Sequence, residues 1–186
     1  MKTILKLLFV LVIASKTTFV CGQDKFHVHL DYNYLFGFYE KSDFWSIRSG
    51  LNGFDLNIAG MYDINKSLSA GMGVGAEKLY DPSYTILPVY AKVAYSPIRA
   101  NERPYVFAKV GYGIGTGISN AGLLLNTGLG YKLQLRKLFA LNFLLGYHLQ
   151  SIRYDLTYYS DAGVISDVKK DHNTRHSLSG GIGFIF

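Results

Sequence analysis

The sequence has few of the residues that build disulfides or membrane helices. One of its 186 residues is a cysteine, Cys21, which we place in a segment removed from the mature chain. No disulfide, thiol catalysis or cysteine metal site is therefore expected. Long apolar runs are also missing. Leu7–Ala14 spans eight residues, and no later stretch approaches the roughly 20 that a helix needs to cross a bilayer. A helical membrane protein is excluded.

A basic stripe is missing as well. The formal net charge is +6, but Lys2, Lys6 and Lys16 leave with the N-terminal segment, so the 19 Lys and Arg side chains fall to 16 against 13 Asp and Glu. No run of like charge stands out in what remains. We therefore expect no nucleic-acid partner.

The N-terminus has the organisation of a secretory signal peptide. Lys2 and Lys6 precede the apolar run, and Val20 and Gly22 occupy the two small-residue positions of a cleavage site. We expect 1–22 to be a cleaved signal peptide and 23–186 to form one domain, because no Pro/Ser-rich linker divides it. Lipoprotein processing at Cys21 is the alternative, which the bulky side chains before the cysteine disfavour.

Apolar and small or polar residues alternate along the mature chain with a period of two, which predicts strands. The segments are about as long as a tilted strand that crosses a bilayer. They are Phe26–Phe36, Phe54–Asp63, Leu68–Glu77, Leu87–Tyr95, Val106–Ile114, Leu123–Gln134, Leu141–Leu156 and Leu178–Phe186. The parity of the seventh segment changes after Leu149, with Ile152, Tyr154 and Leu156 on the apolar face, so we expect a bulge between Gln150 and Arg153. Eight antiparallel strands put both chain ends on one, periplasmic, side.

The connections fall into two classes. Short periplasmic turns are expected at Asp63–Lys66 and Arg136–Lys137, with a longer one between Pro97 and Pro104, because a proline removes a ladder donor. The expected outer loops are Gly37–Ile47, Tyr80–Ser83, Gly115–Ala121 and Thr157–Asn173. Aromatic residues then fall at both ends of the strands, as membrane interfaces select. They are Tyr62, Tyr95, Tyr131, Phe139, Phe184 and Phe186 at the periplasmic end, and Tyr34, Phe36, Tyr84 and Tyr154 at the outer end.

A soluble barrel of the lipocalin type is the competing fold, with the apolar face inside and the polar face in water. The polar face decides against it because it is rich in glycine, as at Gly71, Gly73, Gly111, Gly128 and Gly183. A solvated surface has no reason to lose its side chains, whereas the lumen of a narrow eight-stranded barrel has room for only limited side-chain volume.

The last segment alternates an apolar face with Ser179, Gly181 and Gly183 and ends on an aromatic residue. Its apolar residues are Leu178, Ile182, Phe184 and Phe186. This pattern resembles the closing strand of Gram-negative outer-membrane barrels, and over essentially the whole mature chain the sequence resembles the small porin-like outer-membrane proteins of the OmpA-transmembrane, OmpX and OmpW-like group. The resemblance implies a cell outer-membrane location, contact with lipid and lipopolysaccharide, recognition of this strand by the barrel assembly machinery, and a monomer.

The expected fold is thus all-β: an eight-stranded antiparallel up-and-down transmembrane barrel after a cleaved signal peptide. Its lumen is expected to hold a polar and charged network that plugs it, because buried charges need partners. The predicted members are His29, Asp31, Asp55, Asn57, Glu77, Lys92, Lys109, Asn126, Lys132, His148 and Arg175. The alternative is a narrow porin-like path for ions or small solutes, tuned by these charges.

No catalytic arrangement is evident, and no enzyme activity or cofactor is expected. A lipid-A-modifying barrel enzyme remains as an alternative, with His172, His176, Ser177, Asp171 and Ser151 near the last outer loop. Adjacent His176 and Ser177 would point to opposite faces of a strand, which separates nucleophile from base. His27 and His29 share a face but have no evident third ligand, so no metal site is expected. We expect a structural or binding scaffold whose outer loops carry any recognition.

Overall fold

The computed structural model describes residues 25–41, 46–47, 51–80, 83–98, 103–115, 119–136, 139–159 and 165–186. The expected signal peptide and its cleavage site lie outside these residues. No helix within the described ranges is long and apolar enough to span a membrane.

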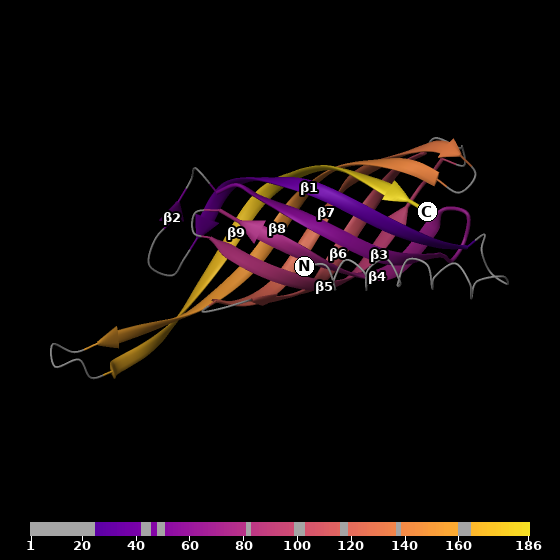
Figure 1. Cartoon of the computed structure of the whole chain (residues 1–186). Coiled ribbons are helices and arrows are strands. Elements are labelled where there is room, and N and C mark those ends of the chain that lie inside the picture. The colour runs from indigo at the N-terminus through magenta and orange to yellow at the C-terminus, as the bar shows by residue number, and fades with distance from the viewer. Residues whose placement is uncertain are drawn as a thin grey trace, which may run out of the picture.

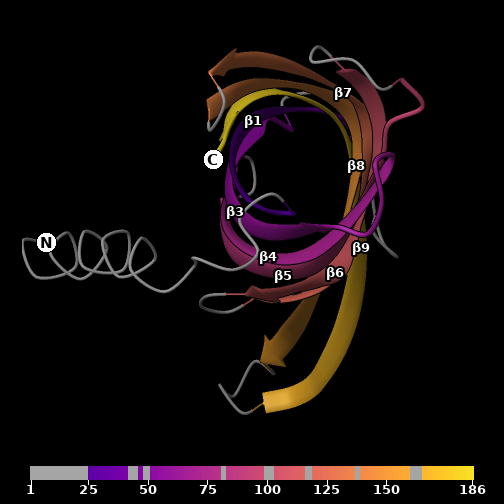
Figure 2. The same cartoon turned by 90° about the vertical axis from the view of Figure 1, so that its right-hand side faces the viewer.

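The described chain is a closed antiparallel barrel (Figures 1 and 2). Its strands are β1 (Phe26–Lys41), β2 (Ser46–Ile47), β3 (Gly53–Asp63), β4 (Leu68–Leu79), β5 (Tyr84–Tyr95), β6 (Arg103–Gly115), β7 (Ser119–Arg136), β8 (Phe139–Tyr159) and β9 (Ile165–Ile185). Each strand from β3 onward pairs with its neighbour in sequence, and β1 pairs with both β3 and β9. The two-residue β2 pairs only with the end of β1, so it is not counted as a strand of the wall. Eight strands therefore form the wall, as the alternation predicted.

The barrel closes where β1 meets β9. Their ladder runs from His29 opposite Ile185 to Lys41 opposite Thr174. Beyond it, the backbone groups of Val28 and Phe186 exchange two hydrogen bonds of 3.0 Å. Since all the wall strands are paired on both sides, no strand edge is left open along the barrel.

Two of the expected outer loops are largely strand. The ladder of β8 and β9 continues to Tyr159 opposite Ile165, so most of the expected loop from Thr157 to Asn173 is a long hairpin that projects from one end of the barrel (Figure 1). The first loop is shortened in the same way, because β1 continues to Lys41. Loop assignment was wrong there because polar residues also occur in strands that extend into water.

The bulge expected between Gln150 and Arg153 is wrong. The ladder from β8 to β9 is regular through this segment, and Ile152 is fully buried inside the barrel. The irregularity lies in the partner strand, where Ala121 and Leu124 of β7 oppose Ile152 and Gln150. Ile152 therefore keeps the inward parity of Gln150, and its apolar side chain joins a cluster in the lumen.

A bulge that the sequence did not predict lies in β1. Gly37 and Tyr39 oppose consecutive residues of β9, Ser177 and His176, so β1 contains one extra residue. Such an insertion reverses the parity of the residues that follow it. Before the bulge the odd positions of β1 face inward, and after it Glu40 does, with no exposed surface. The bulge thereby adds a fourth carboxylate, Glu40, to the predicted lumen acids Asp31, Asp55 and Glu77.

The exterior is apolar, as expected for a wall in contact with lipid. Met72 is 70% exposed, and Leu129 and Leu145 are each 61% exposed. Near the turn between β3 and β4, the predicted ring of aromatic side chains is also exterior, with Tyr62 and Phe186 at least half exposed. The side chains of Tyr84 and Tyr154, expected in the opposite ring, lie outside the described set.

The lumen glycines make room for large side chains on the neighbouring strand. A Cβ placed on Gly73 of β4 would lie 2.6 Å from the ring of Tyr90 on β5, and a Cβ on Gly130 of β7 would overlap the ring of Tyr105 on β6. These glycines are thus needed for the packing inside the barrel, in agreement with the sequence argument for a narrow lumen.

Candidate functional site

The candidate site is the interior of the barrel. Of the predicted lumen set, all but Lys132 are buried. Lys132 is half-buried, near the turn between β3 and β4. The side chains form successive layers along the barrel axis, because inward residues alternate along every strand.

Asp31 is the centre of the first layer. Its Oδ2 lies 3.0 Å from Nζ of Lys92 on β5, and its Oδ1 accepts a hydrogen bond of 3.0 Å from Nδ2 of Asn142 on β8. Asn142 in turn accepts a bond of 2.6 Å from the hydroxyl of Tyr105. His29 completes the group, with Nδ1 at 3.4 Å from the Lys92 nitrogen. The carboxylate thus ties β1 to strands on other sides of the barrel.

Asp55 is held by amides rather than by a direct ion pair. Its Oδ1 accepts hydrogen bonds from Nδ2 of Asn33 at 2.5 Å and from Nδ2 of Asn57 at 2.7 Å. Lys109 lies close to two aromatic rings, with Nζ at 5.3 Å from the ring centre of Tyr90 and 5.9 Å from that of Phe107. These distances are those of cation–π contacts, which stabilise a desolvated ammonium group.

Glu77 and His148 form the next layer. His148 Nε2 lies 3.4 Å from Glu77 Oε1, which places the two groups side by side but outside hydrogen-bond geometry. The other ring nitrogen of His148 is 3.3 Å from Nδ2 of Asn126. Ser177 Oγ and Gln150 Oε1 nearby are also buried without a hydrogen-bond partner among the described residues. This layer is the least well satisfied of the network, and we assign no reaction to it.

Two further layers lie toward the projecting hairpin, the first apolar and the second ionic. Leu35, Leu79, Ile86 and Ile152 have no exposed surface and contact one another as one cluster. In the ionic part, Nε of Arg175 donates a hydrogen bond of 2.6 Å to Oε2 of Glu40. Asn173 Nδ2 bonds the other Glu40 oxygen at 2.9 Å, and Arg175 Nη1 bonds the Tyr80 carbonyl at 3.0 Å. The sequence predicted Arg175 but missed both Glu40 and Asn173, which it assigned to loops.

Two described residues of the alternative enzyme site, His176 and Ser177, lie on opposite faces of β9. Ser177 faces the lumen and is fully buried. His176 lies on the other face of β9, where its Nδ1 contacts the hydroxyl of Tyr147 and its ring lies near Phe38 and Tyr39. Of the other members, His172 is exposed, and the Asp171 side chain lies outside the described set.

The two histidines considered as metal ligands have other partners. His27 Nε2 lies 3.0 Å from Oδ2 of Asp63, and His29 lies beside Lys92. In the described part of the chain, no group of three or more His, Cys, Asp or Glu side chains is placed to hold a metal ion.

The apolar residues of the last strand face outward, as their alternation predicted. Leu178 is 51% exposed, Ile182 53%, Phe184 37% and Phe186 54%. The rings of Phe184 and Phe186 both lie 5.6 Å from the ring of Phe139 on β8. An aromatic cluster thus covers the outside of the β8–β9 pairing, at the barrel end that carries the turn between β3 and β4.

A closed antiparallel barrel with an apolar exterior and a polar interior satisfies every backbone group of its wall without water, as a bilayer requires. This arrangement is that of the bacterial outer-membrane barrels. The chain has the fold of a small outer-membrane β-barrel protein, and its exposed apolar exterior suits contact with lipid.

No protein-family model and no curated protein match the sequence. Among solved structures, the outer membrane protein OprG from Pseudomonas aeruginosa is similar, with a TM-score of 0.55 at 12% identity over 87% of this chain and 96% of that one. Neisserial surface protein A is similar with a TM-score of 0.53 at 18% identity, over 85% and 95% of the two chains. At these identities the similarity establishes the fold alone.

Proposed function

We propose that the protein is an outer-membrane scaffold whose lumen is closed by its own side chains, and whose recognition resides in the segments beyond the β1–β2 and β8–β9 ends. The observation that carries the proposal is the apolar layer of Leu35, Leu79, Ile86 and Ile152, which has no exposed surface. Directly beyond it lies the Glu40–Arg175 pair, equally buried. An ion that crossed the barrel would have to lose its hydration in the first layer and break the pair in the second.

The proposal includes no enzyme activity, since Ser177 is buried facing the lumen while His176 lies on the other face of β9. It also includes a monomer in contact with lipid and lipopolysaccharide, an extracellular ligand for the projecting segments, and recognition of β9 by the barrel assembly machinery. The exposed apolar face of β9 supports the last point.

Planar-bilayer recording of the refolded mature chain tests the closed lumen, with heat-modifiable gel mobility to establish that the barrel has folded. We expect no discrete openings for the wild type. Leu35→Ala combined with Ile152→Ala removes part of the apolar layer and should produce brief openings. Leu129→Ala combined with Leu145→Ala, on the exterior, is the matched control and should stay silent.

Salt-dependent openings of the wild type would instead favour the narrow channel. In that case the buried cations would set its selectivity, and Lys92→Glu or Lys109→Glu should shift the reversal potential toward cation preference.

A further inference from the structure

The ends of β1, β8 and β9 remote from the β3–β4 turn form one part of the exterior wall, at the base of the projecting hairpin (Figure 1). Lys41 of β1 is opposite Thr174 of β9, which is opposite Ser151 of β8. At the next exterior position, Arg153 of β8 is opposite His172 of β9. Lys41, Arg153 and His172 are exposed. We call these five residues the outer basic patch.

The register places the outer basic patch just beyond the apolar band of the wall. A tilted strand crosses the hydrocarbon core with about 9–11 residues. On β9, the stretch from Phe184 in the aromatic cluster to Thr174 has about this length. The paired stretches Leu141–Ser151 of β8 and Leu30–Lys41 of β1 reach the same level. Short turns mark the periplasmic end of such barrels, so the patch lies at the outer leaflet.

The side chains directly below the patch are those of a membrane interface. The Phe38 ring lies 6.4 Å from the rings of Tyr147 and of His176. Amphipathic rings of this kind are enriched at the level of the lipid headgroups. Lys41 and Arg153 follow these rings along their strands, so their long side chains are at headgroup height.

The bulge in β1 separates charge between the lumen and the exterior. Glu40 points inward, where its Oε2 accepts a hydrogen bond of 2.6 Å from Nε of Arg175. Lys41, the next residue, therefore faces outward. Without the extra residue between Gly37 and Tyr39 the parity would be reversed, and Glu40 would face the headgroups instead. The outer basic patch thus contains two cations and no carboxylate.

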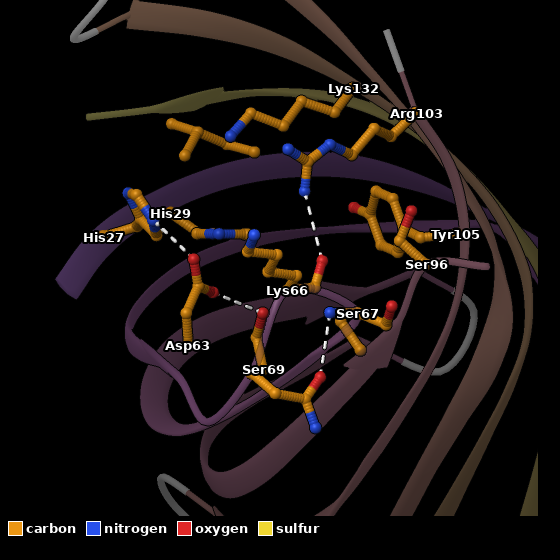
Figure 3. Close-up of a pocket in the computed structure, with 13 residues that line it drawn as sticks. His27, His29, Asp63, Lys66, Ser67, Ser69, Ser96, Arg103, Tyr105 and Lys132 are labelled. Carbon is orange, nitrogen blue, oxygen red and sulfur yellow. Dashed lines mark hydrogen bonds and ion pairs between the residues drawn. The ribbon is translucent and has the colours of Figure 1, made fainter. Parts of the chain in front are cut away.

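Cations near the periplasmic end are placed differently. Lys66, Arg103 and Lys132 line a cavity in the mouth of the barrel beside the β3–β4 turn (Figure 3). They surround the entrance of the lumen, whereas the outer basic patch belongs to the surface that lipid covers.

We propose that the outer basic patch binds the phosphorylated diglucosamine headgroup of lipopolysaccharide, the lipid of the outer leaflet. The planar guanidinium of Arg153 suits two oxygens of one phosphate, and Lys41 supplies a cation for the other. Two strand spacings of about 4.8 Å and two residues of about 3.3 Å separate the Cα atoms of Lys41 and Arg153, about 12 Å in all. The hydroxyls of Ser151 and Thr174 lie between them as donors.

This inference rests on the contact with lipopolysaccharide in the proposed function, and adds the residues that make it. It does not depend on whether the lumen conducts.

Native mass spectrometry of the refolded mature chain, released from detergent micelles, tests the site. Diphosphoryl and monophosphoryl lipid A are titrated separately into the wild type and the double variant Lys41→Gln/Arg153→Gln. The control is Lys25→Gln/Arg136→Gln, which removes a lysine and an arginine from exposed positions near the periplasmic end. Heat-modifiable gel mobility establishes that every variant has folded.

We expect Lys41→Gln/Arg153→Gln to bind diphosphoryl lipid A about tenfold more weakly than the wild type, because two exposed ionic contacts are lost. The control should bind it like the wild type. The wild type should bind monophosphoryl lipid A more weakly than the diphosphoryl form, since one cation then has no phosphate to contact.

The outcomes separate this site from the proposed function. If the wild type binds diphosphoryl lipid A and Lys41→Gln/Arg153→Gln binds it equally well, the contact with lipopolysaccharide stands and the site is wrong. An equal loss in the control would show attraction by net charge alone and would also overturn the site. If the wild type binds no lipid A, both the contact and the site are wrong.

Thermal unfolding, followed by gel mobility, gives a second readout. Without lipid A the three proteins should unfold at similar temperatures, because the substituted side chains are exposed. With saturating diphosphoryl lipid A, the wild type and the control should gain stability by linkage, and Lys41→Gln/Arg153→Gln should gain less. Equal gains for all three would contradict the proposal.

Discussion

Asp31 on β1 and Lys92 on β5 form an ion pair across the lumen, with 3.0 Å between Oδ2 and Nζ and at most 1% of either side chain exposed. The two residues are 61 positions apart in sequence, and their strands are not neighbours in the sheet. Backbone hydrogen bonds hold adjacent strands together, whereas this pair braces the barrel through its interior. Removing one partner leaves a buried charge, and that cost exceeds the worth of the pair itself.

Lys92→Met should therefore be strongly destabilising. We expect a loss of about 3–5 kcal/mol in the free energy of unfolding, because the Asp31 carboxylate remains buried without its cation. Asp31→Asn combined with Lys92→Met removes both charges and should recover most of the loss. Denaturant unfolding in micelles measures both variants. If the double variant were as unstable as Lys92→Met, the unpaired carboxylate would not be the cause.

A second prediction concerns the volume of the lumen. Gly130→Ala places a methyl group against the Tyr105 ring, and overpacking of this kind typically costs about 1–3 kcal/mol. Gly180→Ala is the matched control, because nothing lies within 4 Å of the added atom. Its unfolding midpoint should stay close to that of the wild type. Equal effects of the two substitutions would mean that the glycines matter for the backbone and not for packing.

Alternation alone predicted the inward positions from Asp31 to Lys109, because a period of two is a local property of a strand. It did not predict Glu40, whose inward position depends on the extra residue at Gly37–Tyr39, because such an insertion has no pattern of its own. For Ile152, unbroken alternation from Gln150 gives the inward position; its apolar side chain suggested a bulge that β8 does not contain. The sequence also could not pair Asp31 with Lys92, since contacts across the lumen depend on the stagger of the closed barrel.

The inward position of Ile152 can be tested directly with a spin label. The only cysteine, Cys21, lies in the expected signal peptide, so Ile152→Cys introduces a single labelling site in the mature chain. A label there should be shielded from oxygen dissolved in the lipid, because Ile152 has no exposed surface. Ile114→Cys is the control, since Ile114 is 55% exposed on the outer wall. High oxygen accessibility at both positions would contradict the inward assignment and restore the bulge in β8.

A substitution in the aromatic cluster of Phe139, Phe184 and Phe186 should affect assembly into the outer membrane without affecting folding. Its rings lie on the exterior, so Phe186→Ala removes little from the lumen, and the refolded variant should retain heat-modifiable mobility. In cells we expect the same variant to accumulate less in the outer membrane, because the proposed recognition of β9 depends on its exposed aromatic face. Phe26→Ala, which changes an exterior ring 39% exposed on β1, is the control and should assemble normally.

Comparing outer-membrane yield with refolding yield for the two variants tests the prediction. If Phe186→Ala reached the membrane as the wild type does, assembly would depend on another part of the chain; if it failed to refold as well, the ring would be needed for the fold itself.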